Sequence, residues 1–459
     1  MIDTLAASIE TLASALFMPW VVVALMGTGI FLTFRLGFVQ FRRIGEAFRA
    51  MVAGQSGGAG GALSPFQAFM MALAASVGTG NIAGVATAII SGGPGALFWI
   101  WVFGFFAAAI KFAEATLGLS FREMVDGTTR TGPMYYLRDG LKKPWLAWTY
   151  ALVAGVAALT TTPFTQPNSI AVVWQSEFSI PTWATGVIVA VLTWLVIIGG
   201  VKSIGRAAEK LAPLKVGLYL AGGLIVIISF INELPGVLAL VFREAFAMDS
   251  ALGFGMFIAI RYGIARGVYA SEAGYGTAAV AYGTAKSDRP SQQGLQAVME
   301  VFIVCFVTAT ISALTILVTG VAMRSIDAGP DGAGYLTSTA AVAAAFDAAM
   351  PVVGGYVVAF CAFLFGYTTL IGWAYYGEQF LEYIFGRSVT VPYRWIYCLL
   401  IPFGAVARVD VVWAWGDFMN ALQVFPNVIG LIGLSGLVAK FAWDRNTGSR
   451  LPTPGSSRP

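Results

Sequence analysis

The chain has 459 residues, of which 58% are hydrophobic and only 11% are charged, and no soluble protein of this length needs so apolar a composition for its core. It has no histidine, which excludes Ser-His-Asp hydrolases and histidine-based metal sites, and its three cysteines show no metal-ligand spacing. The formal net charge of +4 is modest. This composition predicts an all-α polytopic membrane protein that packs as one bundle.

Apolar stretches of membrane-spanning length occur eleven times along the chain. The predicted spans are 15–35, 64–91, 94–120, 148–173, 182–200, 211–231, 250–281, 292–321, 351–384, 392–408 and 413–441. Lysine and arginine gather in every second loop, so the positive-inside rule places the N-terminus outside and the C-terminus in the cytoplasm. We therefore expect a multi-pass protein of the plasma (inner) membrane.

The charge pattern also predicts how the spans are organised. Residues 1–63 are expected to form an N-terminal transmembrane helix and a cytoplasmic linker, and 444–459 a disordered cytoplasmic tail. Between them, ten spans form a core of two repeats, 64–231 and 250–443, whose spans run in opposite senses. In such inverted five-plus-five repeats the first helix of each repeat is discontinuous, and both 64–91 and 250–281 contain several glycines.

The polar hexad Ser76-Val77-Gly78-Thr79-Gly80-Asn81 interrupts the first core span. Lipid offers no partners to exposed backbone groups, so a helix broken at this depth favours a binding site. Close helix packing through small residues is the alternative, but the Asn81 amide would be costly in lipid. Free N–H groups at a half-helix N-terminus attract a carboxylate, and unwound carbonyl groups suit Na⁺.

Two later stretches are also polar at membrane depth. Thr368 and Thr369 either bond back to their own helix or offer hydroxyl oxygens to sodium. Pro163 and Pro167 predict a kinked or opened helix, in which Gln166 and Asn168 either face a substrate or bond to neighbouring helices.

The intramembrane charges allow two interpretations. Lys111 and Glu114 have the spacing of an i, i+3 pair. Arg261, Arg266 and Glu272 form either an inner gate or a fixed structural network. Glu300 is a single carboxyl without a visible relay, which gives little support to proton coupling.

Several motifs together resemble the alanine or glycine:cation symporter family over residues 35–435. They are Ser76-Val77-Gly78-Thr79-Gly80-Asn81-Ile82-Ala83-Gly84, Gly92-Gly93-Pro94-Gly95-Ala96, Lys111-Phe112-Ala113-Glu114, Gly132-Pro133-Met134-Tyr135-Tyr136, Ser271-Glu272-Ala273-Gly274 and Gly372-Trp373-Ala374-Tyr375-Tyr376-Gly377-Glu378. This resemblance implies a leucine-transporter-like fold, no enzymatic activity, and inward symport of small neutral amino acids, chiefly alanine and glycine, with Na⁺ by alternating access. Proton coupling, a broader specificity and, further off, a channel remain alternatives.

The resemblance also implies roles for individual residues. Residues expected to bind the substrate are Gly78, Thr79, Gly80, Gln166, Gly263 and Ile264, the last two at the expected opening of the sixth core helix. Residues expected to bind sodium are Ala74, Val77, Thr368 and Thr369, with Asn81 and Ser76 for a second ion. The chain departs from the family at 161–164 and at Ser271, and the first departure leaves the preferred amino acid, including its enantiomer, open. Ion stoichiometry and oligomeric state are likewise not fixed by the sequence.

Overall fold

The computed structural model describes residues 11, 16, 20–52, 60–125, 127–248, 255–330 and 332–443, without the side chains of 409 and 410. The predicted tail 444–459, the start of the chain and the glycine-rich link at 53–59 lie outside these residues.

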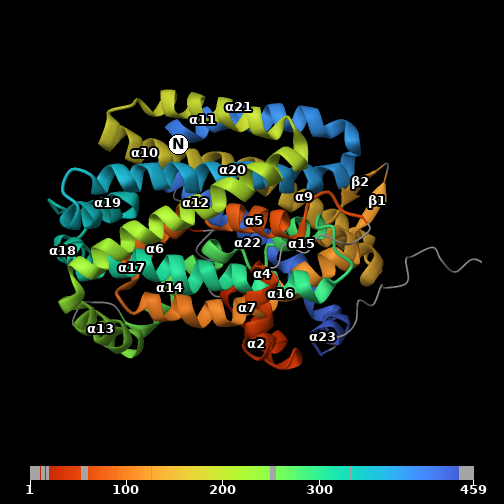
Figure 1. The fold of residues 1–459 in the computed structure, drawn as a ribbon, viewed down its shortest axis with the longest axis horizontal. Coiled ribbons are helices and arrows are strands. Elements are labelled where there is room, and N and C mark those ends of the chain that lie inside the picture. The colour runs from red at the N-terminus through yellow and green to blue at the C-terminus, as the bar shows by residue number, and fades with distance from the viewer. Residues whose placement is uncertain are drawn as a thin grey trace, which may run out of the picture.

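The described residues are almost entirely helical (Figure 1). The first half contains α2 (Val22–Arg35), α3 (Val39–Arg42), α4 (Ile44–Val52), α5 (Pro65–Ser76), η2 (Thr79–Asn81), α6 (Ala83–Gly92), α7 (Ala96–Ser120), β1 (Glu123–Val125), β2 (Thr128–Arg130), α8 (Pro133–Tyr135), η3 (Tyr136–Gly140), α9 (Pro144–Thr160), α10 (Thr162–Phe178), α11 (Thr182–Ile197), α12 (Gly200–Ser229), η4 (Ile231–Glu233) and α13 (Leu234–Phe246). The second half contains α14 (Met256–Ser271), α15 (Thr277–Gly283), α16 (Pro290–Val301), η5 (Phe302–Thr308), α17 (Ala309–Val318), α18 (Val321–Ala328), α19 (Ser338–Ala349), α20 (Gly354–Phe385), η6 (Arg387–Val389), α21 (Thr390–Val406), α22 (Val409–Gly433) and α23 (Ser435–Trp443). The two strands pair antiparallel as a small hairpin.

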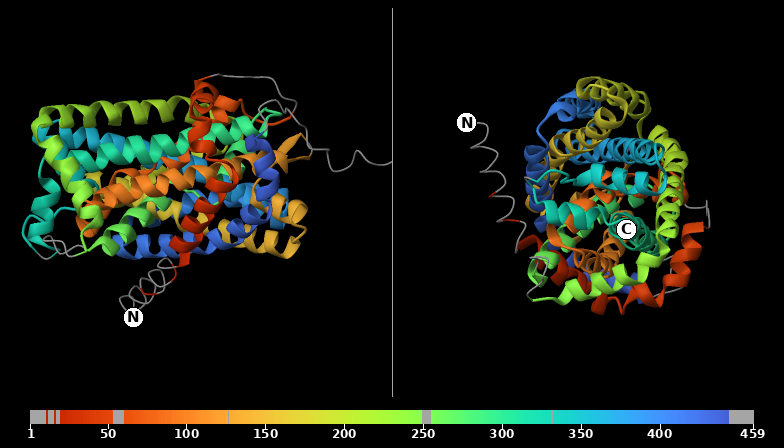
Figure 2. Two further views of the ribbon diagram at one scale, coloured as in Figure 1. Left: turned by 90° about the horizontal axis from the view of Figure 1, so that it is seen from below. Right: turned by 90° about the vertical axis from the view of Figure 1, so that its left-hand side faces the viewer.

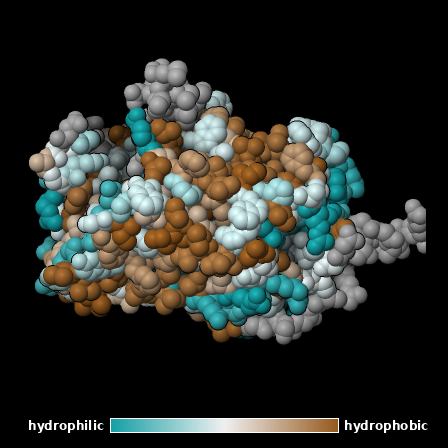
Figure 3. Space-filling model, turned by 90° about the horizontal axis from the view of Figure 1, so that it is seen from above, coloured by the Kyte–Doolittle hydropathy of each residue, from teal (hydrophilic) through white to brown (hydrophobic). Residues whose placement is uncertain are grey.

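The long helices lie nearly parallel to the longest axis of the molecule, as the three views of Figures 1 and 2 show. The β1–β2 hairpin and α18 lie at opposite ends of this axis (Figure 1). Figure 3 shows a face that is mostly hydrophobic over its middle, with hydrophilic residues gathered at the two ends and along part of one edge. This distribution is the one expected of a bundle whose helices cross a bilayer along the long axis.

Among the described residues, six helices are long and apolar enough to cross a membrane, or eight if each of two bent pairs counts as one span. Three shorter apolar helices, α2, α11 and α19, add to these. These helices show the polytopic helical architecture. They do not by themselves show the predicted count of eleven spans.

The first core span is broken within the predicted hexad. Its first half, α5, begins with a capping box between Ser64 and Gln67 and ends at Ser76. Gly78 is extended, a short 3-10 turn follows, and α6 continues from Ala83, with a bend of 61° between the two halves. The break therefore exposes backbone groups in the interior of the bundle.

The sixth core span is broken later than predicted. Helix α14 runs without interruption through Gly263 and Ile264 and ends at Ser271, so the predicted opening at these two residues is wrong. The chain leaves the helix at Glu272, which has φ +54°, and turns through Gly274 and Gly276 before α15 begins. Positive φ angles favour glycine, which is why the break follows the later glycines and not Gly263.

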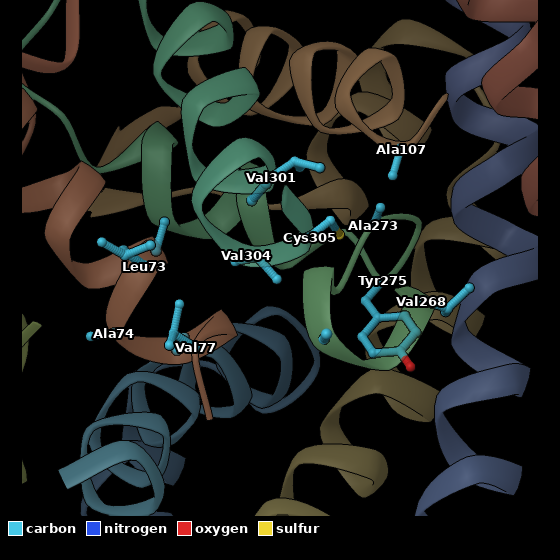
Figure 4. Packing of buried hydrophobic residues seen from close by; sticks show 14 of the residues in the cluster. Leu73, Ala74, Val77, Ala107, Val268, Ala273, Tyr275, Val301, Val304 and Cys305 are labelled. Atoms are coloured by element: carbon cyan, nitrogen blue, oxygen red, sulfur yellow. The ribbon is translucent and has the colours of Figure 1, made fainter. Parts of the chain in front are cut away.

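The two broken helices meet the long helix α7 and its neighbours in one core. Helix α7 packs against α14, α15 and α16, and α5 packs against α12 and α20. Figure 4 shows Leu73, Ala74 and Val77 at the end of α5, and Ala273 and Tyr275 in the second break, as parts of the same buried hydrophobic cluster. The α5–α6 and α14–α15 segments are thus each broken, and each is followed along the chain by a long helical segment, α7 and Pro290–Val318.

Candidate functional site

Gln166 on α10 faces the first broken helix. Its side-chain oxygen Oε1 accepts hydrogen bonds from the backbone N–H of Thr79, at 3.1 Å, and from the Thr79 hydroxyl, at 3.0 Å. Both side chains are buried. The Thr79 N–H lies at the start of the short turn that leads into α6, where the helix dipole favours negative charge. The Gln166 oxygen occupies this position.

A small pocket surrounds this contact, between the two helix breaks. Its lining comes from α5, α10, α14, α20 and α22, from the two breaks and from Thr161 just before α10. The lining residues are Ala75, Ser76, Gly78, Gly80, Thr161, Thr162, Gln166, Tyr269, Glu272, Tyr275, Thr369, Trp373 and Asn420. The backbone of the break comes close to the opposite wall: a Cβ added to Gly78 would lie 2.7 Å from the Thr369 hydroxyl oxygen, and one added to Gly80 would lie 2.6 Å from the Tyr269 ring. Glycine is therefore needed at both positions.

Tyr275 adds a polar group to this pocket. Its hydroxyl is buried and has no hydrogen-bond partner within the described part of the chain. An unpaired buried hydroxyl is costly, so a molecule in the pocket that bonds to it gains free energy.

The predicted sodium ligands Ala74, Val77 and Thr368 are brought together around the side chain of a buried lysine. The side-chain nitrogen Nζ of Lys215, on α12, lies 2.9 Å from the Ala74 carbonyl oxygen, 2.5 Å from that of Val77 and 2.6 Å from the Thr368 hydroxyl oxygen. The hydroxyl of Thr369, the fourth predicted ligand, lies 2.9 Å from the Ala75 carbonyl oxygen and 3.3 Å from that of Ala74.

Asn81 and Ser76, predicted for a second ion, lie together in a different place. The Asn81 amide nitrogen donates to the Ser76 carbonyl oxygen at 3.0 Å, and its amide oxygen lies 3.2 Å from the Thr308 hydroxyl. Ser312 donates to the Asn81 carbonyl at 2.6 Å. All of these side chains are buried, so the end of η5 and the start of α17 provide oxygens beside the first break.

A carboxylate satisfies the second break. Oxygen Oε1 of Glu114, on α7, accepts hydrogen bonds from the backbone N–H groups of Gly274 and Gly276, at 2.9 and 3.0 Å, and from the Asn427 amide at 2.8 Å. The predicted Lys111–Glu114 pair is therefore wrong: Lys111 forms its salt bridge with Glu300, at 2.9 Å. Lys111 thus contacts α16, and Glu114 contacts the α14–α15 break and α22, so the two side chains do not bond to each other.

The predicted charge cluster on α14 separates into two. Glu272 accepts a hydrogen bond from the Trp373 indole at 2.6 Å and one from the Thr277 hydroxyl at 2.8 Å. Arg266 lies 3.8 Å from Asp417 on α22, a looser and partly exposed ion pair. Glu272 thus belongs to the pocket wall, and Arg266 connects α14 to α22.

Known proteins that are similar to this chain show its family. The model of the sodium:alanine symporter family matches residues 2–448. The chain belongs to this family. Relatives include the sodium/alanine symporter of Methanococcus maripaludis, 39% identical over 94% of this chain and 95% of that protein, and the probable sodium/glutamine symporter of Bacillus subtilis, 34% identical over 91% and 86%. A putative sodium/proton-dependent alanine carrier of Bacillus subtilis is 35% identical over 93% and 90%.

Solved structures show the fold of this family member. MhsT in complex with L-phenylalanine has a TM-score of 0.54 at 15% identity, over 83% of this chain and 100% of that chain. A manganese transporter of Eremococcus coleocola has a TM-score of 0.54, also at 15% identity, over 80% and 79%. At this identity only the leucine-transporter-like fold is shared. The sodium:alanine symporter family member is an integral membrane transporter and not an enzyme.

Some predicted residues of the symporter lie away from the pocket. Gly263 packs against the Ala96 carbonyl and Trp99 on α7, and Ile264 is buried one position further along the same helix. Asn168 donates to the Ala407 carbonyl at 2.8 Å, so it connects α10 to the end of α21. Ser271 bonds back to the Gly267 carbonyl at 2.8 Å.

Other residues of the candidate site were missed from the sequence. Lys215 lies within the predicted span 211–231, and an ionisable residue at membrane depth is by itself a functional signal. Tyr269, Tyr275, Trp373 and Asn420 carry no such signal, because aromatic and amide side chains occur throughout the chain and only the fold shows which of them line the pocket.

Proposed function

We propose that this protein is a secondary active symporter that couples inward Na⁺ flux to uptake of small neutral amino acids, alanine or glycine, by alternating access. The observation that carries the proposal is the contact of Gln166 with Thr79 between two broken helices. Family membership and the sodium/alanine symporter of Methanococcus maripaludis among its relatives support it.

The substrate carboxylate would take the place of the Gln166 oxygen at the Thr79 N–H. An anion is favoured at this helix start, and Gln166, once displaced, would offer its amide nitrogen or oxygen to the substrate. Gly78 and Gly80 would let the carboxylate approach the backbone, which a Cβ at either position would obstruct.

The aromatic rings of the pocket favour a small substrate. Tyr269, Tyr275 and Trp373 line it together, so their rings would meet the substrate side chain within a short distance. Thr161 and Thr162, at the departure from the family motif, also line it, which makes them the residues that would adjust the preferred amino acid.

The co-transported sodium ion would bind near Asn81 and Ser76, with Thr308 as an added ligand. Neutral amide, carbonyl and hydroxyl oxygens suit a hard cation. Because the ion and the carboxylate would share the first break, each should raise the affinity for the other by the same factor.

Two features of the proposal concern the membrane. The protein would have eleven spans, with α2, α11 and the α14–α15 pair completing the eight that length and composition support. Its C-terminus would lie in the cytoplasm, together with the exposed Lys142. A cysteine introduced at Lys142 should react with a membrane-impermeant maleimide only after cells are permeabilised, and reaction in intact cells would reverse the orientation.

Uptake by the purified protein in liposomes tests the function. Labelled alanine and glycine should accumulate with an inward Na⁺ gradient and much less with K⁺ or a pH gradient alone. Accumulation driven by the pH gradient alone would replace sodium by the proton, and accumulation of glutamine but not alanine would change the substrate. Product formation without net uptake, or single-channel currents, would reject a carrier.

A further inference from the structure

We propose that the ammonium group of Lys215 is the resident cation of the oxygen cluster formed by Ala74, Val77 and Thr368, so that this cluster takes no sodium ion in the native protein. The inference deepens the proposed function and rests on it in one respect: it leaves a single sodium ion for each amino acid, at the site of Asn81.

Each of the three N–H donors of the Lys215 ammonium group has an acceptor. A lysine ammonium has three N–H donors and no acceptor. Nζ of Lys215 meets three acceptors, the two carbonyl oxygens of Ala74 and Val77 and the hydroxyl oxygen of Thr368, at 2.9, 2.5 and 2.6 Å. No donor is left over, which fits a group that belongs in this place.

The surroundings of Lys215 favour a positive charge on its side chain. Lys215 is 0% exposed, and it forms no salt bridge with the described residues. Its charge lies instead at the C-terminal end of α5, whose last carbonyl groups carry the negative end of the helix dipole. The Phe365 ring, whose centroid lies 5.3 Å from Nζ, adds a cation–π contact. These interactions favour a cation there, although no carboxylate of the described residues touches it.

The charge of Lys215 would also exclude a sodium ion from the oxygens of Ala74, Val77 and Thr368. A sodium ion on the same three oxygens would lie beside a like charge in a buried region, where repulsion between charges is strong. Lys215 connects α12 to both the first broken helix and α20, so the ammonium also holds together three elements that a bound ion would otherwise have to join. Lys215 is therefore a positioning residue for the break that carries Thr79.

Counting bound sodium ions tests the proposal. Binding of radiolabelled sodium is measured on the full-length purified protein at saturating alanine, for the wild type, Lys215→Ala and the matched control Lys210→Ala, which removes an exposed lysine of the same helix. Lys215→Ala should bind one ion more than the wild type, with a steeper sodium dependence of binding, and Lys210→Ala should bind the wild-type number. An equal count in the wild type and Lys215→Ala would overturn the proposal.

A second variant decides the question if Lys215→Ala does not fold. Thr368→Val removes the hydroxyl oxygen while keeping the shape of the side chain, and it should slow alanine uptake but bind as many sodium ions as the wild type. One ion fewer would show that these oxygens hold sodium and would overturn the proposal. The proposed function would fail if the wild type showed no sodium-stimulated uptake. The numbers of sodium ions bound by the variants could still be compared in that case, so the two failures are distinguishable.

Discussion

The side-chain oxygen of Gln166 lies 3.1 Å from the backbone nitrogen of Thr79, at the point where the first broken helix resumes. In this arrangement the protein satisfies, with its own amide, the group that the substrate carboxylate is proposed to bind. The alanine-bound protein should therefore differ from the free one first at this contact.

Gln166→Ala should weaken alanine binding about tenfold or more, which corresponds to roughly 1.4 kcal/mol. In this variant the substrate loses a buried polar partner. This loss outweighs the gain from not having to break the hydrogen bond between the Thr79 N–H and Gln166. Calorimetric titration of the purified protein with alanine measures this, with Gln175→Ala, an exposed position on the same helix, as the control. An unchanged affinity in Gln166→Ala would remove the residue from the site.

Gly78→Ala should reduce alanine uptake more than tenfold. The added Cβ would lie 2.7 Å from the Thr369 hydroxyl oxygen and 3.1 Å from the Gln166 oxygen, so the wall of the pocket has to shift. Gly217→Ala on α12 is the matched control, because its Cβ would meet no atom of the described residues within 4 Å. Uptake in liposomes compares the two, and equal activity of both variants would contradict the close approach at Gly78.

Thr308→Val should raise the sodium concentration needed for half-maximal uptake about tenfold, which is roughly the effect of one lost charge-assisted contact. The hydroxyl oxygen lies 3.2 Å from the amide oxygen of Asn81, where the ion is proposed to bind. Thr193→Val removes another buried hydroxyl, which among the described residues bonds only to the Val189 carbonyl, and should leave the sodium dependence unchanged. If the two variants behave alike, the ion binds elsewhere.

The ion pair of Lys111 can be assigned by double-mutant cycles. Variants that neutralise Lys111 and Glu300 singly and together should give a coupling of roughly 0.5–3 kcal/mol in stability, because the two groups are in contact. The same cycle with Glu114 should give a smaller coupling, since that carboxylate bonds to Gly274, Gly276 and Asn427. Thermal unfolding in detergent measures both cycles, and a larger coupling with Glu114 would restore the pairing that the sequence suggested.

Local chain chemistry was enough to predict the helical membrane architecture and the first helix break. Hydrophobic runs of membrane length are a property of the chain alone, because lipid requires every backbone group to be satisfied within the segment. The glycines and the polar Asn81 in the hexad indicated the place where this requirement is relaxed. The resemblance implied that Gln166 binds the substrate, whereas its contact with Thr79 is known only from the structure.

The second break shows where sequence patterns were insufficient. Span 250–281 contains six glycines, and nothing in their spacing distinguishes Gly263 from Gly274 and Gly276. The partners on other helices make the difference: Gly263 packs on α7, whereas Glu114 of α7 accepts the N–H groups of Gly274 and Gly276. Lys111 likewise bonds to Glu300, 189 positions away in the sequence, and not to Glu114 on its own helix.

The sequence by itself determined that this protein is a bundle of membrane helices, that one of them is interrupted by polar residues, and that histidine chemistry is absent. The tertiary structure decided which groups satisfy the interrupted backbone: Gln166 at Thr79, Glu114 at the second break, and the side-chain nitrogen of Lys215 on the oxygens predicted for sodium. The physical reason is that helix propensity and hydrophobicity act between near neighbours in the chain. The partner of a buried charge or an unpaired carbonyl, in contrast, is chosen by distance in space.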